Sequence, residues 1–436
     1  MKKITAYITS SPFAAIAAHV LILLTMYCIL SFLGFIKGMP TNESLIQYDV
    51  VFYKSIADAG YSYAPGTQSN VAFFPLFPLI WKLSHLSSVM MSLLNLVFML
   101  AGMVILNKVL RLRRSEFLLL LSTPSLLFCY IPYSEALFFL SCSLFIYGLD
   151  RNFKLALLGI FLACLCRSAS MTFIPVLIFT ALFYIKPKRT VENRKHIIRF
   201  SLLIAASLLA LLLSQFIQYL QTGEFFVIFE AQKQWDRVFK FPTSYLTTWD
   251  GIRLIWLDGL AFLTGVVSAV IAVIVFIRKV SGTGKTISPV FVFSIGYLAL
   301  VTVTILFFST VDTYLGGTSI FSLNRFVFAT PFFFVFLMLS FRYFKLNVKL
   351  ILYFTLISAV VWLLFNAHGY IEGLTIFDLK YFKTKLYFII TFLYSLVYVA
   401  MIDKNKRLQL WSGLYIFNII LQLYLFNGFF NGRWVG

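Results

Sequence analysis

The sequence predicts an all-α, polytopic transmembrane helix bundle, and three observations support this fold class. Hydrophobic residues make up 61% of the 436 residues, charged residues only 12%, and the mean hydropathy is +0.91. No soluble domain of this length has such a composition. Apolar stretches of about 20 residues, the length that crosses the hydrocarbon core, recur along the whole chain. Positive charges gather in every second connecting segment.

We expect about thirteen spans in a single membrane domain that covers residues 1–436. In chain order they are 12–36, 86–107, 116–130, 135–149, 155–170, 172–185, 200–221, 256–278, 288–308, 325–341, 350–366, 384–401 and 410–427. Segments 116–130, 135–149 and 172–185 are short, so tilted, re-entrant or buried helices are alternatives there. The first span is too long for a removable signal peptide, so its expected role is anchoring.

The net charge of +20 would suit a nucleic-acid partner, but the distribution of the charges argues against one. Basic residues gather in alternate loops, of which 186–199 is the richest, and by the positive-inside rule this side is the cytoplasm. The acidic residues fall mostly on the other side. They are Asp49, Asp58, Glu224, Glu230, Asp236, Asp250, Asp258, Asp312, Glu372 and Asp378. The N-terminus is therefore expected inside and the C-terminus outside.

The cysteines and histidines indicate no metal site. The chain has five cysteines and four histidines, and neither set shows the spacing of metal ligands. The cysteines lie in apolar stretches, where they are expected to act as small hydrophobic residues. We therefore expect neither a metal nor a cofactor.

The first long external segment, residues 37–85, has the pattern that points most directly to chemistry. It reads QYDVVFYKSIA at residues 47–57, GY at 60–61 and AFFPLFP at 72–78. This places Asp49 among aromatic residues directly outside the first span. A membrane enzyme that deprotonates an acceptor hydroxyl at the bilayer surface needs a fixed carboxylate of this kind. A helix N-cap or a solvated loop carboxylate is the structural alternative.

This segment resembles the GPI mannosyltransferase II (PIG-V) family and its bacterial relatives, which are C-type (GT-C fold) integral-membrane glycosyltransferases. That family reads roughly Trp-Asp, an aromatic pair, Ile-Ala, Gly-Tyr and then Ala-Phe-Phe-Pro-Leu-Phe-Pro, and Tyr48 stands here in the place of its Trp. The resemblance implies a GT-C-like fold whose external loop helices carry the active site. It also implies that Asp49 is the general base, with Tyr48 and Tyr53 shaping the site around it.

Two ionisable residues interrupt apolar stretches further along the chain. Glu135 lies in PYSEALFF at residues 132–139 and Arg167 in CRSAS at residues 166–170. Charges at membrane depth are costly and mark functional sites by default. Similar segments occur in the resembled family. Glu135 and Arg167 are therefore expected either to shape the site or to form a structural ion pair, and the pair is the favoured interpretation for Arg167.

The second long external segment, residues 222–255, contains Gln232, Lys233, Trp235 and Arg237. Bacterial members of the resembled family have a similar Gln, Trp and basic segment, which implies a role for Lys233 and Arg237 at the donor phosphate, with Gln232 and Trp235 shaping the site. An amphipathic helix in the headgroup layer is the equal alternative, because Trp and basic residues favour that layer.

A third basic position lies at the external mouth of a span. The chain reads SLNRF at residues 322–326 and TPF at 330–332, so Arg325 begins a span on the side that is poor in positive charge. A guanidinium there can bind phosphate oxygens with two donors. We expect Arg325 to bind the donor phosphate and Asn324 to shape the site. Snorkelling at the interface is the structural alternative.

The expected function is transfer of a sugar, with mannose favoured, from a polyprenyl-phosphate-linked donor to an acceptor on the external face. Such a donor explains how an outward site receives its sugar without a nucleotide-binding motif. The acceptor can be a glycan, a lipid or a protein. A polytopic transporter or lipid flippase is the alternative function. The expected location is a bacterial cytoplasmic membrane, with the endoplasmic reticulum as the alternative.

Overall fold

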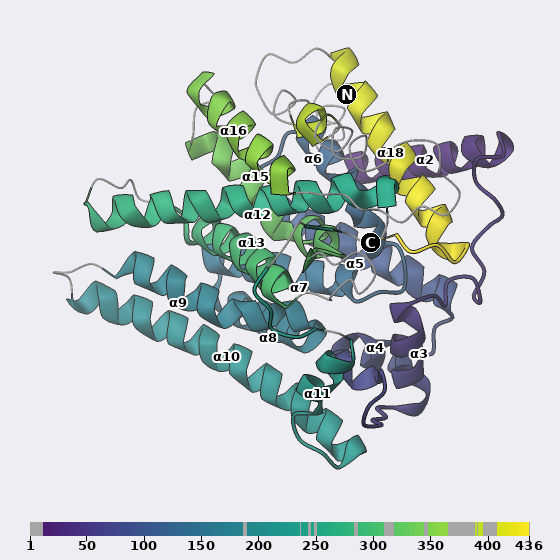
Figure 1. Ribbon diagram of the computed structural model, residues 1–436, viewed down its shortest axis with the longest axis horizontal. Coiled ribbons are helices and arrows are strands. Elements are labelled where there is room, and N and C mark those ends of the chain that lie inside the picture. Colours follow the sequence, from purple (N-terminus) through teal and green to yellow (C-terminus); the bar gives the residue numbers. More distant parts are fainter. Residues whose placement is uncertain are drawn as a thin grey trace, which may run out of the picture.

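The computed structural model describes residues 12–185, 190–235, 237–242, 246–247, 251–282, 287–308, 318–343, 348–364, 389, 391–395 and 408–435. These residues form a helical bundle (Figure 1). The described strands are two short ones, β1 (Leu246–Thr247) and β2 (Thr318–Ser319), which pair in parallel. The all-α prediction is confirmed for the described part of the chain.

Six helices of the described residues are long and apolar enough to cross a membrane. They are α2 (Pro12–Phe32), α5 (Ser88–Leu110), α10 (Thr190–Thr222), α12 (Gly251–Val280), α13 (Pro289–Phe307) and α18 (Leu408–Phe430). These helices support a multi-pass membrane protein in a lipid bilayer. The number of thirteen spans stays a prediction, and most of the predicted span 384–401 lies outside the described residues.

The predicted span 116–130 is wrong as a continuous helix. The chain forms α6 (Arg114–Leu121), breaks, and continues as the 3-10 helix η2 (Pro124–Cys129). The cause is Pro124, which disfavours a helical conformation at Thr123 and lacks an amide hydrogen for the ladder. Thr123 accordingly has ψ 123°. The break brings the η2 residues into the interior of the bundle.

A tight hairpin of two helices positions two of the ionisable residues. Helix α7 (Glu135–Arg151) packs against α8 (Phe153–Cys166) over most of its length. A Cβ on Gly148 would lie 2.0 Å from the backbone nitrogen of Ala156, so only glycine permits this approach. Because the two helices are antiparallel, the first residue of α7 and the residue after α8 meet at the same end. These residues are Glu135 and Arg167.

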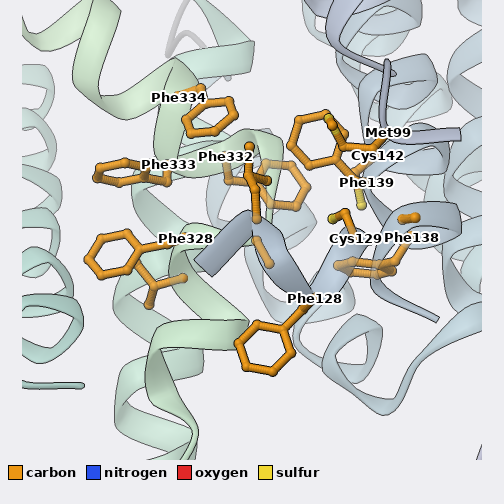
Figure 2. Close-up of a cluster of buried hydrophobic side chains, with 14 of the residues drawn as sticks. Met99, Phe128, Cys129, Phe138, Phe139, Cys142, Phe328, Phe332, Phe333 and Phe334 are labelled. Atoms are coloured by element: carbon orange, nitrogen blue, oxygen red, sulfur yellow. The ribbon is translucent and has the colours of Figure 1, made fainter. Parts of the chain in front are cut away.

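Phenylalanine dominates the core beside this hairpin (Figure 2). The rings come from η2, from α7, and from α14 (Leu323–Phe328) with α15 (Pro331–Tyr343). The 3-10 helix η3 (Ser168–Thr172), α9 (Phe173–Tyr184) and α16 (Val348–Leu364) complete the bundle. Four cysteines are buried and unpaired, as expected of small hydrophobic residues, whereas Cys28 is exposed.

Three short helices gather beside the C-terminal end of α10 (Figure 1). They are α3 (Asp49–Ala59) and α4 (Leu76–Ser84), which flank the 3-10 helix η1 (Asn70–Ala72), and α11 (Val227–Gln234). Two glutamines of α10 hold this group. Gln218 Nε2 donates to the carbonyl of Val71 at 2.9 Å, and Gln221 Oε1 accepts from the amide of Tyr61 at 2.6 Å. The first external segment is thus held against α10, and α11 packs against its 3-10 helix η1.

Candidate functional site

Asp49 is the first residue of α3, and the backbone before it is strained. Tyr48 has φ 52° and ψ −122°, a combination that is rare for any residue with a Cβ. Such a conformation costs about 1–3 kcal/mol and persists where the surroundings enforce it, often at functional sites. Here the Tyr48 hydroxyl donates to the carbonyl of Gly432 at 2.6 Å. This backbone conformation directs the chain into α3, so that Asp49 is the first residue of the helix.

Arg325 lies on a second helix, α14, which also follows a residue with positive φ. This residue is Ser322, with φ 65°, and its carbonyl accepts a hydrogen bond from the amide of Arg325 at 3.1 Å. The neighbouring Asn324 is fixed by Asp258 of α12, whose Oδ1 accepts from the Asn324 amide at 2.9 Å and from its side chain at 2.7 Å. Ser125 of η2 donates to Asn324 Oδ1 at 3.0 Å. The backbone on which Arg325 stands is thus held from two sides.

The guanidinium of Arg325 joins the two carboxylates that the sequence analysis singled out. Its Nε and Nη2 donate to Glu135 Oε1 at 2.9 and 2.6 Å, and Nη2 also donates to Asp49 Oδ2 at 2.9 Å. The side chains of Arg325 and Glu135 are 6% and 2% exposed, whereas that of Asp49 is 19% exposed. Asp49 is therefore the member of this group that a ligand can reach.

The predicted ion pair between Glu135 and Arg167 is confirmed. Arg167 Nη1 contacts Glu135 Oε1, and the Arg167 side chain is 9% exposed. Its Nη1 also lies 3.4 Å from the hydroxyl of Ser134, which shares a 2.7 Å hydrogen bond with the hydroxyl of Tyr53. Tyr53 belongs to α3, so this chain of contacts connects the helix that carries Asp49 to the α7–α8 hairpin. We call Asp49, Glu135, Arg167 and Arg325 the charged cluster.

Three aromatic rings surround the Arg325 guanidinium. Its Cζ lies 4.7 Å from the ring centre of Tyr133, 5.0 Å from that of Phe128 and 6.0 Å from that of Trp434. Ring faces attract a guanidinium and exclude water from it. With two carboxylates and three rings as neighbours, Arg325 has little freedom to move. It holds the carboxylate of Asp49 in a fixed place.

A second aromatic group forms around Phe52, one turn along α3 from Asp49. Trp235, which follows α11, contacts Phe52 at 5.1 Å and Phe73 at 5.9 Å between ring centres. Phe52 and Phe73 are themselves stacked at 5.1 Å. The amide of Arg237 donates to the carbonyl of Gln232 at 3.0 Å, which closes a turn around Trp235. The predicted site-shaping residues Gln232 and Trp235 thus belong to a turn that packs against α3.

Arg237 is the basic residue of that turn whose charge interacts with those of the charged cluster. It is half-buried, and burial lowers the pKa of its guanidinium while Asp49 raises it and Arg325 and Arg167 lower it. The guanidinium forms no ion pair with any residue that the structure describes. Together with the charged cluster it makes three guanidinium groups beside two carboxylates. A guanidinium that pairs with no carboxylate of the described residues favours binding of an anion.

Lys233 does not join this group. It lies on the exposed face of α11 and pairs with Glu230 at 2.8 Å. An exposed pair of this kind contributes little to stability. No cluster of His, Cys, Asp and Glu suited to a metal ion occurs among the described residues.

The sequence analysis missed two residues of the site. Asp258 was expected in an external segment, but it lies buried in α12 and holds Asn324. Its signal was a carboxylate inside the apolar run LIWLDGLAFL at residues 254–263. Trp434 gave no such signal, because a tryptophan near a helix end is common at any membrane interface.

Comparison with known proteins adds no relative. No protein-family model, no curated protein and no solved structure matches this chain. The resemblance to the PIG-V family therefore rests on the sequence stretches quoted above, and the geometry of the site has to carry the functional conclusion.

Proposed function

We propose that this chain is a membrane glycosyltransferase that moves a sugar, with mannose favoured, from a polyprenyl phosphate to an acceptor hydroxyl on the external face. One observation carries the proposal. The partly exposed carboxylate of Asp49 is fixed by a buried arginine, and its charge interacts with that of Arg237, which forms no ion pair with any described residue. A fixed base beside such a cation suits a reaction that removes a proton from a hydroxyl and releases a phosphate.

In this reaction Asp49 accepts the proton of the acceptor hydroxyl as its oxygen attacks the anomeric carbon. The bond from that carbon to the phosphate oxygen breaks, and polyprenyl phosphate leaves with the electron pair. Glu135 is buried behind Arg325 and pairs with two guanidinium groups, so it is no second nucleophile. Asp49 is thus the accessible carboxylate of the charged cluster, which supports one-step displacement with inversion of the anomeric centre.

The donor phosphate binds at Arg237, with Arg325 beside it. Arg325 uses Nε and Nη2 on Glu135 and Asp49, so its first role is to position Asp49. Arg237 forms no ion pair with the described residues, and its charge interacts with those of Asp49 and Arg325. Its guanidinium can neutralise charge as it builds on the leaving phosphate. Lys233, on the exposed face, is the weakest of the three candidates for phosphate binding.

A transporter or flippase remains the second candidate, and the burial of the charged cluster is the observation that favours it. Ionisable groups inside a helix bundle also mark transport pathways. The two functions differ in whether a covalent bond breaks. A transporter would move its solute or lipid across a bilayer without releasing polyprenyl phosphate.

The test is turnover by the purified full-length protein in lipid nanodiscs. Polyprenyl-phosphate mannose is supplied with hydroxyl acceptors, and released polyprenyl phosphate is measured by mass spectrometry. We expect release by the unaltered protein and none by Asp49→Asn. Asp58→Asn is the matched control, because Asp58 lies on the same helix and pairs with Lys54 on an exposed face. Failure of the unaltered protein to cleave mannosyl or other hexosyl donors, with transport of a lipid or solute, would favour the second candidate.

A further inference from the structure

The chain folds back after α18 and brings a tryptophan to the charged cluster. The amide of Gly432 donates to the carbonyl of Phe429 at 3.0 Å and that of Arg433 to the carbonyl of Gly428 at 2.8 Å. Gly432 has φ 76°, which glycine adopts without strain. This turn ends the helix and reverses the chain, so that Trp434 lies beside residues more than a hundred positions away.

Trp434 contacts the segments that precede Asp49 and Arg325. Its ring centre lies 4.7 Å from that of Tyr48, which precedes Asp49, and 4.9 Å from that of Phe321, which precedes α14. The Arg325 guanidinium lies 6.0 Å from the same ring. The Tyr48 hydroxyl also donates to Gly432 in the turn. Trp434 is therefore the residue that connects the strained start of α3 with the start of α14.

The indole nitrogen of Trp434 is buried without a hydrogen-bond partner among the residues that the structure describes. An indole N–H is a donor only. Leaving a donor buried and unpaired is unfavourable in a folded protein. Trp411, on the same stretch of chain, shows the ordinary arrangement, since its Nε1 donates to the carbonyl of Ser115 at 3.2 Å. The unpaired donor of Trp434 lies on a residue that contacts Arg325, where the proposed reaction takes place.

We propose that Trp434 is a substrate-binding residue whose Nε1–H donates to an oxygen of the sugar-phosphate donor bound beside Asp49 and Arg325, and whose ring keeps Arg325 in position. This inference rests on the proposed function. The N–H contributes to binding of the donor and the ring to the placement of Asp49. Removing only the N–H should therefore weaken donor binding, and removing the ring should also slow transfer.

The experiment separates the two roles with matched replacements of Trp434. Trp434→Phe keeps an aromatic ring beside Tyr48 and Phe321 but loses the donor. Replacement by benzothienylalanine keeps the shape of the indole and exchanges the N–H for sulfur, so it serves if the Phe variant is poorly folded. Trp434→Leu removes the ring. Trp411→Phe is the control, because it removes a paired donor at the opposite end of α18.

The measurement is kcat and KM for polyprenyl-phosphate mannose in nanodiscs, together with thermal unfolding of each variant. Loss of one neutral hydrogen bond predicts a rise in donor KM of about 2- to 12-fold for the Phe and benzothienyl variants, with kcat within twofold. Trp434→Leu should add about a tenfold loss of kcat. Trp411→Phe should leave both constants unchanged.

Three results would overturn this inference. The first is donor KM and kcat within twofold of the unaltered protein in both ring-preserving variants, which leaves the proposed transferase function standing. The second is a loss confined to kcat in those variants, because the N–H then has no part in donor binding. The third is an unaltered protein that cleaves no polyprenyl-phosphate sugar, which overturns the proposed function and this inference with it.

Discussion

This bundle contains two groups of buried polar side chains, and only for one of them does a need for backbone hydrogen bonds account for the burial. The charged cluster joins α3, α7, α14 and the residue after α8. A neutral group forms where α18 passes the break between α6 and η2. There Gln422 Nε2 donates to the carbonyls of Leu121 and Thr123 at 3.0 and 2.7 Å, and Asn418 Nδ2 donates to the hydroxyl of Ser122 at 3.1 Å.

The neutral group supplies hydrogen bonds to backbone carbonyls at a break in a helix. The last carbonyls of a helix have no partner within it, and Pro124 adds a missing donor at the break. Gln422 supplies hydrogen bonds at this point, so a structural role accounts for it. The ion pairs of the charged cluster join side chains and satisfy no backbone group at a helix break. Burying ion pairs often costs more in desolvation than the pairs return, and apolar residues of the same volume would pack as well. The comparison teaches that burial alone does not mark a site, whereas buried charge without a structural need does.

The largest effect is expected at the accessible end of the charged cluster. Asp49→Asn keeps the size of the side chain and an acceptor for Arg325 but removes the base. We expect transfer to fall by about 100- to 10,000-fold. Far-UV circular dichroism and thermal unfolding should stay close to those of the unaltered protein. Turnover near normal in a folded Asp49→Asn protein would remove the carboxylate from the mechanism.

Substitutions of the buried residues Glu135 and Arg167 should lower stability as well as activity. Glu135→Gln removes the carboxylate that Arg167 contacts, and Arg167→Met removes one of the two guanidinium groups that neutralise Glu135. Loss of a buried ionic partner costs about 3–5 kcal/mol. The double variant should be less harmful than the sum of the two single changes, because it removes both charges of the pair together. Unfolding free energies in a double-mutant cycle measure this coupling. Additive effects would contradict a direct energetic link between the two residues.

Substitutions of Arg325 test the importance of its simultaneous hydrogen bonds to Glu135 and Asp49. Arg325→Lys keeps the charge but cannot reproduce the bonds from Nε and Nη2 to Glu135 and Asp49. We expect single-turnover transfer to slow by about 10- to 100-fold, with a smaller change in donor affinity if Arg237 is the main phosphate ligand. Arg325→Ala should be worse. An unchanged rate with weaker acceptor binding would assign Arg325 to the acceptor.

Asp258 offers an intermediate case, because it acts on the cluster through Asn324. Asp258→Asn weakens the two hydrogen bonds that fix Asn324 and so loosens the start of α14. Loss of a charged acceptor is worth about 1.5–3 kcal/mol per bond. We expect lower thermal stability and a fall in kcat smaller than that of Arg325→Lys. A greater loss of activity than for Arg325→Lys would mean that Asp258 has a direct role.

The fold class and several members of the cluster could be predicted from the sequence for the same physical reason. A long apolar chain must span a membrane, and a charge inside an apolar run is conspicuous because it is expensive. Glu135 and Arg167 were visible in this way, whereas Asp49 stood out by its aromatic neighbours in an external segment and Arg325 by its place on the side poor in positive charge. The pairing of Glu135 with Arg167 was expected because each charge is expensive alone in an apolar stretch.

Other features depend on packing that local patterns do not encode. Arg325 bonds to residues 190 and 276 positions away, and only the packing of α14 beside η2 and α3 brings them together. The span 116–130 was drawn from hydropathy, which does not register that Pro124 interrupts the helix. Trp434 depends on the turn at Gly432, so its place beside Arg325 was invisible in the sequence.

The smallest effect is expected in the neutral group, and it is the sharpest check of the comparison. Gln422→Leu keeps a side chain of comparable size but removes the amide group that donates to the carbonyls of Leu121 and Thr123. Hydrogen bonds between membrane helices average about 0.6 kcal/mol, so we expect a loss of stability of about 1 kcal/mol. Turnover measured below the unfolding temperature should stay within twofold of the unaltered protein. A tenfold loss of turnover in a folded Gln422→Leu protein would show that the neutral group also serves the reaction, and the distinction between the two groups would fail.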